Sequence, residues 1–174
     1  MKISGRNLKR RLYGLSRVRD RVSRMRYFHG HGVHSPFVYA IVRQVFMRSH
    51  FMTDDSYYTE VVYGALLEQH VPRKRAVQLV NLCVHCGYAE IAYGRPCAAD
   101  LIIVPQHIEP VRFPDYVSAA RTCGATLAIV APGLNREREQ ACRAIVAAHT
   151  GTTVDNRGFL LVFHNHLPKQ HFRL

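Results

Sequence analysis

The residues with the clearest chemical potential are cysteines and histidines. Cys83 and Cys86 form a CxxC pair, a spacing that occurs in zinc sites and in redox-active thiol pairs. A structural zinc site needs four ligands, so Cys97 and His107 would have to complete it. The pair also ends an apolar stretch of helical periodicity, where cysteine packs as a small hydrophobic residue. We favour this second interpretation and predict no metal site.

Histidines gather near both ends of the chain, at His29, His31, His34, His164, His166 and His171. If the two ends met in space, their imidazoles could bind a transition metal. Surface positions and hydrogen bonds within turns explain these histidines equally well, and we favour that explanation.

The turn at residues 93–97 is a third candidate, because it follows the first strand that the sequence predicts, over 88–93. In nucleotide-binding α/β folds this turn carries several glycines, which allow the backbone to approach the cofactor closely. Here Gly94 is the only glycine of the turn. No Gly-x-Ser-x-Gly or HExxH motif occurs, and Glu90, Asp100 and Asp115 are scattered without a paired spacing. The sequence therefore names no catalytic residue.

Periodicity and capping residues predict the elements that must position these groups. Helices are expected over 6–27, 36–46, 56–70, 73–86, 113–123 and 136–149, with Ser35 and Asn135 as N-caps. Strands are expected over 88–93, 101–104, 126–131, 152–155 and 159–164, the last two forming a hairpin around Asn156-Arg157-Gly158.

This order predicts an α/β fold, because strands joined through helices form parallel sheets. We expect a reduced Rossmann-like, mainly parallel sheet of about five strands, ordered first, second, third, fifth, fourth. The closing hairpin should place an antiparallel strand at one edge. The whole chain, 1–174, is predicted to be a single domain, with a helical N-terminal extension over 1–86 and the Rossmann-like core over 87–174.

Charge is distributed unevenly along the chain. The formal net charge is +12, and residues 1–26 hold ten Lys or Arg against the single acid Asp20. The other residues carry 14 basic and 11 acidic groups. Such a basic segment suits polyanions, either nucleic acid or an acidic membrane surface. The candidate contacts are Arg6, Lys9, Arg10, Arg17, Arg21 and Arg24. A docked amphipathic helix with a solvated basic side is the simpler alternative.

The remaining composition indicates where the protein resides. No run of about 18 apolar residues occurs, so no membrane span is expected. The basic N-terminal segment lacks a following apolar region, which argues against a secretory signal. The five cysteines follow no disulfide framework. A cytoplasmic protein with free thiols is the prediction.

Three stretches resemble a bacterial family of class I SAM-dependent methyltransferase-like proteins. They are HGVHSPFVY at 31–39, the strands ADLIIV at 99–104 and ATLAIVAP at 125–132, and VDNRGFLLVFHNHLPKQHF at 154–172. The resemblance covers about residues 15–173. Its more specific parts are the end motifs, His34, Ser35, Pro36, Phe37 and Lys169, Gln170, His171, Phe172. It implies a methyltransferase-like protein that holds S-adenosyl-L-methionine (SAM) near Glu90, Gly94 and Gln106, at the carboxyl ends of the strands.

The chain departs from the family at the expected cofactor site. Residues 96–100 stand where the family has two further strands with their helices, one of which ends in the acid that holds the cofactor ribose. Pro105-Gln106 and Pro132-Gly133 replace the acids expected after the later strands. These losses predict a degenerate, inactive relative, which would need SAM and an unidentified methyl acceptor if it were active. Two alternatives stay open: a non-catalytic module that binds a polyanion through residues 2–26, and a protein-interaction scaffold or homodimer that uses an exposed sheet edge.

Overall fold

The computed structural model describes residues 35–174. The helix expected over 6–27, the six basic residues proposed to contact a polyanion, and His29, His31 and His34 lie outside the described residues.

Helices open the described part of the chain. Helix α2 (Pro36–Ile41) continues directly into the π-helical turn η2 (Val42–Phe46). The side chain of Ser35 accepts a hydrogen bond from the Val38 amide, 3.4 Å away, which confirms Ser35 as the N-cap. A second pair, η3 (Tyr57–Val62) and α3 (Tyr63–Glu68), is followed by α4 (Arg73–Cys86). The helices expected over 36–46, 56–70 and 73–86 are therefore confirmed.

Alternating strands and helices follow. The sheet contains β1 (Ile91–Tyr93), β2 (Leu101–Val104), β3 (Thr126–Val130), β4 (Thr152–Asp155), β5 (Phe159–Val162) and β6 (Gln170–Arg173). A short turn of 3-10 helix, η4 (Pro110–Arg112), leads into α5 (Phe113–Cys123), and α6 (Arg136–Ala148) joins β3 to β4.

The strand order is β1-β2-β3-β5-β4-β6, which confirms the predicted order of the first five strands and adds a sixth. Strand β5 pairs antiparallel with both β3 and β4, while the other pairs are parallel. The expectation of an antiparallel strand at the edge is wrong, because the antiparallel strand β5 lies inside the sheet, between β3 and β4, and β6 forms the edge. Strand β6 was not predicted, because its residues are mostly exposed and show no strand periodicity.

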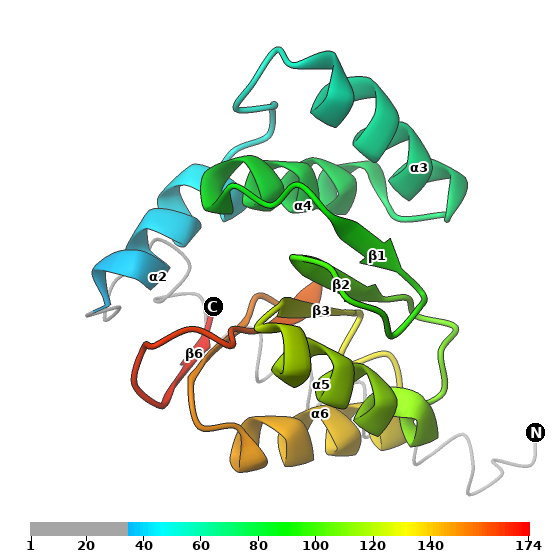
Figure 1. Cartoon of the computed structure of the whole chain (residues 1–174), viewed down its shortest axis with the longest axis vertical. Helices are drawn as coiled ribbons and strands as arrows, with labels where there is room; N and C mark the ends of the chain where they lie inside the picture. The colour runs from blue at the N-terminus through cyan, green and yellow to red at the C-terminus, as the bar shows by residue number, and fades with distance from the viewer. Residues whose placement is uncertain (1–34) are drawn as a thin grey trace, which may run out of the picture.

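Helices cover both faces of the sheet (Figure 1). On one face α2, η2 and α4 pack against alternate strand residues such as Leu101, Ile103 and Leu161. On the other face α5 and α6 pack against the intervening residues, such as Ile102 and Leu160. The helices before the sheet therefore form one of its two covering layers.

An unusually short link joins the parallel strands β1 and β2. Residues 94–100 make this crossover, where parallel neighbours usually need about a dozen residues. The carboxylate of Asp100 accepts hydrogen bonds from the amides of Ala89, at 2.8 Å, and Glu90, at 3.0 Å. These amides bind a side chain instead of a neighbouring strand, so β1 begins at Ile91 and not at Tyr88 as expected.

No helix within residues 35–174 is both long enough and apolar enough to cross a membrane.

Asp100 should matter for stability, although it is exposed. The change Asp100→Ala leaves the two amides without their acceptor, and we expect it to lower the free energy of unfolding by about 1–2 kcal/mol. Urea denaturation followed by circular dichroism measures this change. Asp54→Ala is the control, since Asp54 is exposed and makes no side-chain hydrogen bond to the described residues. Equal stability of the two variants would contradict the role assigned to Asp100.

Candidate functional site

Strands β1, β2 and β3 end at the same edge of the sheet, here called the carboxyl edge. In open α/β sheets ligands bind outside this edge. The loops that follow β2 and β3 meet there, together with the first turn of α6. Asn135 caps that helix, since its side-chain oxygen accepts a hydrogen bond from the Arg138 amide at 2.8 Å. This cap confirms the sequence-based prediction and fixes the direction in which Arg138 leaves the helix.

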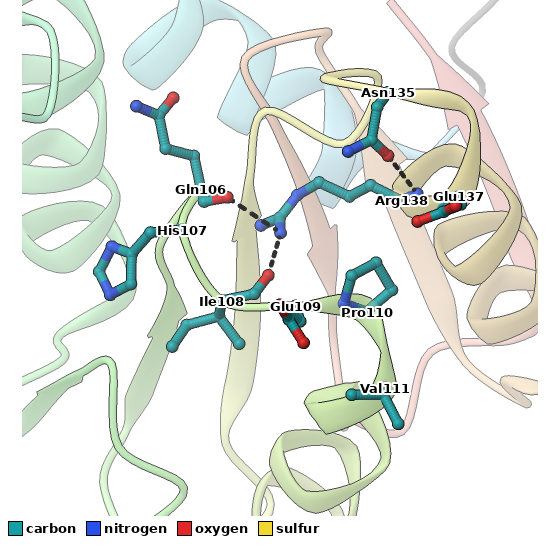
Figure 2. Close-up of a pocket in the computed structure, with 9 residues that line it drawn as sticks. All are labelled: Gln106, His107, Ile108, Glu109, Pro110, Val111, Asn135, Glu137 and Arg138. Atoms are coloured by element: carbon teal, nitrogen blue, oxygen red, sulfur yellow. Dashed lines mark hydrogen bonds between the residues drawn. The ribbon is translucent and has the colours of Figure 1, made fainter.

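The side chain of Arg138 extends from α6 across the carboxyl edge (Figure 2). Its guanidinium donates to the carbonyls of Val130 (from Nε and Nη2), Pro105 (from Nη2), and Gln106 and Ile108 (from Nη1). The shortest of these bonds, to Ile108, measures 2.6 Å. All three guanidinium nitrogens therefore bind main-chain carbonyls, which come from the end of β3 and from the loop after β2.

Arg138 is a buried cation, with 1% of its surface exposed. Its acceptors among the described residues are main-chain carbonyls, and their dipoles compensate the charge together with the ring of Phe113, 4.8 Å from Cζ. Burial lowers the pKa of the guanidinium from its usual value. An arginine nevertheless stays protonated at neutral pH. The charge is therefore a fixed structural element of the carboxyl edge.

A hollow of about 400 Å³ lies beside Arg138. Its lining residues are Gln106, His107, Ile108, Glu109, Pro110, Val111, Asn135, Glu137 and Arg138. The polar side chains at its rim, including His107, Glu109 and Glu137, are exposed. Because exposed groups are well solvated, this rim offers polar contacts but no buried reactive group.

The three residues expected to hold a cofactor do not come together. Gly94 follows β1 at the carboxyl edge, and Gln106 follows β2 there. Glu90 precedes β1, so its expected place at the carboxyl ends of the strands is wrong. The three residues of β1 separate Glu90 from Gly94, and the four steps of extended chain between them span about 13 Å.

Gly94 is enclosed by the protein itself. Its left-handed backbone, with φ of 67°, is a conformation that favours glycine. Its amide donates to the Ile103 carbonyl at 2.9 Å, and its carbonyl accepts from the Tyr116 hydroxyl at 2.7 Å. A Cβ atom at this position would lie 3.5 Å from the Pro105 ring. The left-handed backbone favours glycine at this position, and Pro105 and Tyr116 both lie against it.

The CxxC pair occupies the last turn of α4. Cys83 is fully buried, and burial raises the pKa of its thiol to about 12. Burial also raises the pKa of Cys86. High thiol pKa values oppose both metal ligation and redox reactivity. Among residues 35–174, no three side chains of the metal-binding types stand close enough to hold an ion.

The C-terminal histidines and the remaining end-motif residues make structural contacts. His164 Nδ1 lies 2.8 Å from the Ala125 carbonyl, and His171 Nδ1 lies 2.8 Å from the Thr153 hydroxyl. His166 is exposed to solvent. The other end-motif residues also have structural positions. Pro36 begins α2, and the Phe37 ring packs edge-on against Phe163. Lys169 Nζ donates to the Ala147 carbonyl, and Gln170 and Phe172 lie in β6.

No protein-family model matches the chain, and no curated protein or solved structure is significantly similar to it. The resemblance drawn from the end motifs therefore stays a prediction.

Arg138 is the principal residue of this edge that the sequence did not reveal. It stands among charged residues at the start of an amphipathic helix, where a solvated position is the usual expectation. Arg138 is buried only because the ends of β2 and β3 lie against it. Nothing in the sequence near Arg138 indicates these contacts.

Replacing Arg138 tests its structural role. Arg138→Met keeps much of the side-chain volume but leaves several buried carbonyls without donors, so the free energy of unfolding should fall by about 3–5 kcal/mol. Urea denaturation measures the loss. Arg136→Met, at an exposed neighbouring position, should change stability by less than about 0.5 kcal/mol. A loss below about 1 kcal/mol for Arg138→Met would contradict the role of the carbonyl contacts.

Proposed function

We propose that this chain is a non-catalytic relative of the SAM-dependent methyltransferase-like proteins, and that it binds a polyanion through its basic segment, residues 2–26. The first half of the proposal rests on the carboxyl edge. The second half rests on the concentration of positive charge in one short segment.

The arrangement of the carboxyl edge supports the loss of SAM binding. A cofactor needs a concave site with several converging polar groups. Here the guanidinium of Arg138 spans the ends of β2 and β3, Pro105 and Tyr116 cover Gly94, and Glu90 lies at the opposite edge. These contacts among the chain's own residues support the proposal that the cofactor site is lost.

Topology supports the same conclusion. In a doubly wound sheet the ligand crevice forms where the strand order reverses and adjacent loops lead to helices on opposite faces. Within the described residues, β1, β2 and β3 follow one another in one direction, and β1 leads directly into β2. Helices α5 and α6 both cover the same face. The loops after β2 and β3 therefore lead to the same face, and the hollow between them is lined by exposed polar side chains and by Arg138, whose guanidinium already binds main-chain carbonyls.

Charge supports the polyanion. Ten basic residues against one acid fall within residues 1–26, whereas the described residues carry 14 basic and 11 acidic side chains. Phosphate-rich polymers and acidic lipid surfaces attract such a segment with little need for sequence-specific contacts.

The scaffold alternative has weaker support. The amide of Gly94 and the carbonyl of Glu90 face β2, so the backbone groups of Ile91 and Tyr93 face outward at this edge. An edge of three residues offers few hydrogen bonds to a partner. Tyr57 also donates to the Ala89 carbonyl just before β1. Short edge strands are a common protection against pairing, so we do not assign the function to this edge.

Titration with SAM tests the first half of the proposal. A ligand present at a hundred times its Kd stabilises the native state by about 2.7 kcal/mol, equivalent to a rise in Tm of about 5–10 °C for a chain of this size. We expect about 1 mM SAM or S-adenosylhomocysteine to leave Tm unchanged. Isothermal titration provides the independent measurement, and micromolar binding by either method would refute the proposed loss.

Salt dependence tests the second half. If the six basic residues each contact a phosphate of a single-stranded oligonucleotide, the slope of log K against log salt should be about −4. Fluorescence anisotropy measures the affinity, and anionic lipid vesicles are tested in parallel. Replacing Arg6, Lys9, Arg10, Arg17, Arg21 and Arg24 with Gln should reduce the slope nearly to zero.

The control removes the same charge elsewhere. Six exposed arginines of the described residues are changed to Gln: Arg43, Arg95, Arg112, Arg121, Arg136 and Arg143. This variant should keep most of its affinity. If both variants lose affinity equally, net charge and not the basic segment controls binding, and the assignment to residues 2–26 is wrong.

A further inference from the structure

Two histidine rings meet at the edge of the sheet opposite Arg138, where β3 begins and β5 ends. His149 is the C-cap of α6, and His164 follows β5 by two residues. Their ring centres lie 4.9 Å apart, with the ring planes at 78°. Both side chains are half-buried. The sequence did not predict this pair, because His149 belongs to neither of the histidine groups near the chain ends.

Each ring is fixed by one hydrogen bond to the main chain. His149 Nε2 lies 2.9 Å from the Phe163 carbonyl oxygen, and His164 Nδ1 lies 2.8 Å from the Ala125 carbonyl oxygen. A carbonyl only accepts, so each of these nitrogens carries the proton and donates. In a neutral imidazole the other nitrogen then holds a lone pair, which leaves His149 Nδ1 and His164 Nε2 as acceptors.

The backbone leaves room for the first of these bonds. A Cβ atom at position 151 would lie 2.9 Å from both His149 Nε2 and the Phe163 carbonyl oxygen, so Gly151 is what allows their contact. Histidines that bind metals usually donate their other ring N–H to a carbonyl or a carboxylate, which fixes the tautomer and the direction of the lone pair. Both rings of this pair have that arrangement.

The two lone pairs are available to a ligand. Among the described residues no donor binds His149 Nδ1 or His164 Nε2, and the side-chain nitrogen that is buried without a partner belongs to Asn156. Both lone-pair nitrogens are therefore in contact with solvent. Burial, and to a smaller extent His164 and Lys169, lower the pKa of His149, so its ring is neutral at neutral pH. The neutral ring is the form that binds metal ions.

We propose that His149 Nδ1 and His164 Nε2 together bind one divalent transition-metal ion of the kind that prefers imidazole, such as Zn²⁺, Ni²⁺ or Cu²⁺. A metal–nitrogen bond of about 2.0–2.1 Å places the ion about 3.2 Å from the ring centre, so two rings on one tetrahedral ion have centres about 5 Å apart. The separation of 4.9 Å between His149 and His164 matches this value. The ion joins the end of α6 to the segment that follows β5.

The surroundings of the pair select the kind of ion. Within residues 35–174 no third His, Cys, Asp or Glu side chain completes the site, so water fills the other coordination positions. The ammonium of Lys169 donates to the Ala147 carbonyl at 2.7 Å, in the last turn of α6, and its charge acts on His149. Without a carboxylate and with a cation nearby, the pair does not suit Mg²⁺ or Ca²⁺, which prefer oxygen ligands. The site requires neither the basic segment 2–26 nor the carboxyl edge.

Nuclear magnetic resonance of the full chain tests the assignment atom by atom. Zn²⁺ is added to isotope-labelled protein at neutral pH, and long-range proton–nitrogen spectra follow both nitrogens of each ring. We expect His149 Nδ1 and His164 Nε2 to shift along one common saturation curve, while His149 Nε2 and His164 Nδ1 stay N–H donors. Because each ring is observed separately, zinc bound at exposed thiols or at other histidines does not disturb the result.

The ion control uses Mg²⁺ at the same concentration, which should shift neither ring. Rings that do not respond to zinc, or that saturate at different zinc concentrations, would overturn the proposal.

Two substitutions keep the hydrogen bonds and remove the lone pairs. His149→Gln retains an N–H at the ε position for the Phe163 carbonyl, and His164→Asn retains one at the δ position for the Ala125 carbonyl. Each should weaken zinc binding at the remaining ring at least about tenfold, measured by the same spectra. His166→Gln removes an exposed histidine from the loop after β5 and should keep the original affinity. Unchanged affinity of the remaining ring in either variant would show that the two rings do not share an ion, and the spectra of the unsubstituted chain decide the question even where a variant fails to fold.

Discussion

The carboxyl edge depends on one requirement: a guanidinium removed from water must find acceptors for all its nitrogens. Arg138 meets it with main-chain carbonyls alone, from the end of β3 and from the loop after β2. The dependence is mutual, because those carbonyls would otherwise be buried without donors. One side chain from α6 thus joins two strand ends that hydrogen bonds within the sheet do not join at this point. The ends of β2 and β3 are therefore held to each other beside the hollow.

The shortness of the β1–β2 crossover has a related effect. A full crossover would carry a helix to a face of the sheet and separate the loops at the carboxyl edge. Residues 94–100 are too few for this, so the chain passes directly over the end of β2, where Pro105 and Tyr116 contact Gly94. In a larger sheet the separated loops leave a ligand crevice at this edge, whereas here Gly94 is in contact with other residues of the protein.

The sequence predicted what is decided by nearby residues. The caps at Ser35 and Asn135, the helices over 73–86 and 113–123, and the turn at Asn156-Arg157-Gly158 all depend on short-range chemistry, and all are confirmed. The sequence-based predictions were wrong or incomplete where contacts between distant segments of the chain determine the structure. Strand β6 forms only because the edge of β4 is available, and Glu90 lies outside β1 because the Asp100 carboxylate binds its amide. The burial of Arg138 likewise depends on two strand ends about 8 and 33 residues away in the sequence.

Two arginines near one edge of the sheet, Arg138 and Arg75, differ in how many hydrogen-bond acceptors the protein gives them. Both are removed from much of the solvent, and burial lowers the pKa of both. Arg138 has its nitrogens bound to carbonyls, so an added anion would gain little from it and would have to displace existing bonds. Arg75 has one side-chain acceptor, Gln78, and is only half-buried. Burying a charge is costly unless it is compensated. The protein compensates the fully buried Arg138 from within, whereas part of the Arg75 side chain stays in contact with solvent.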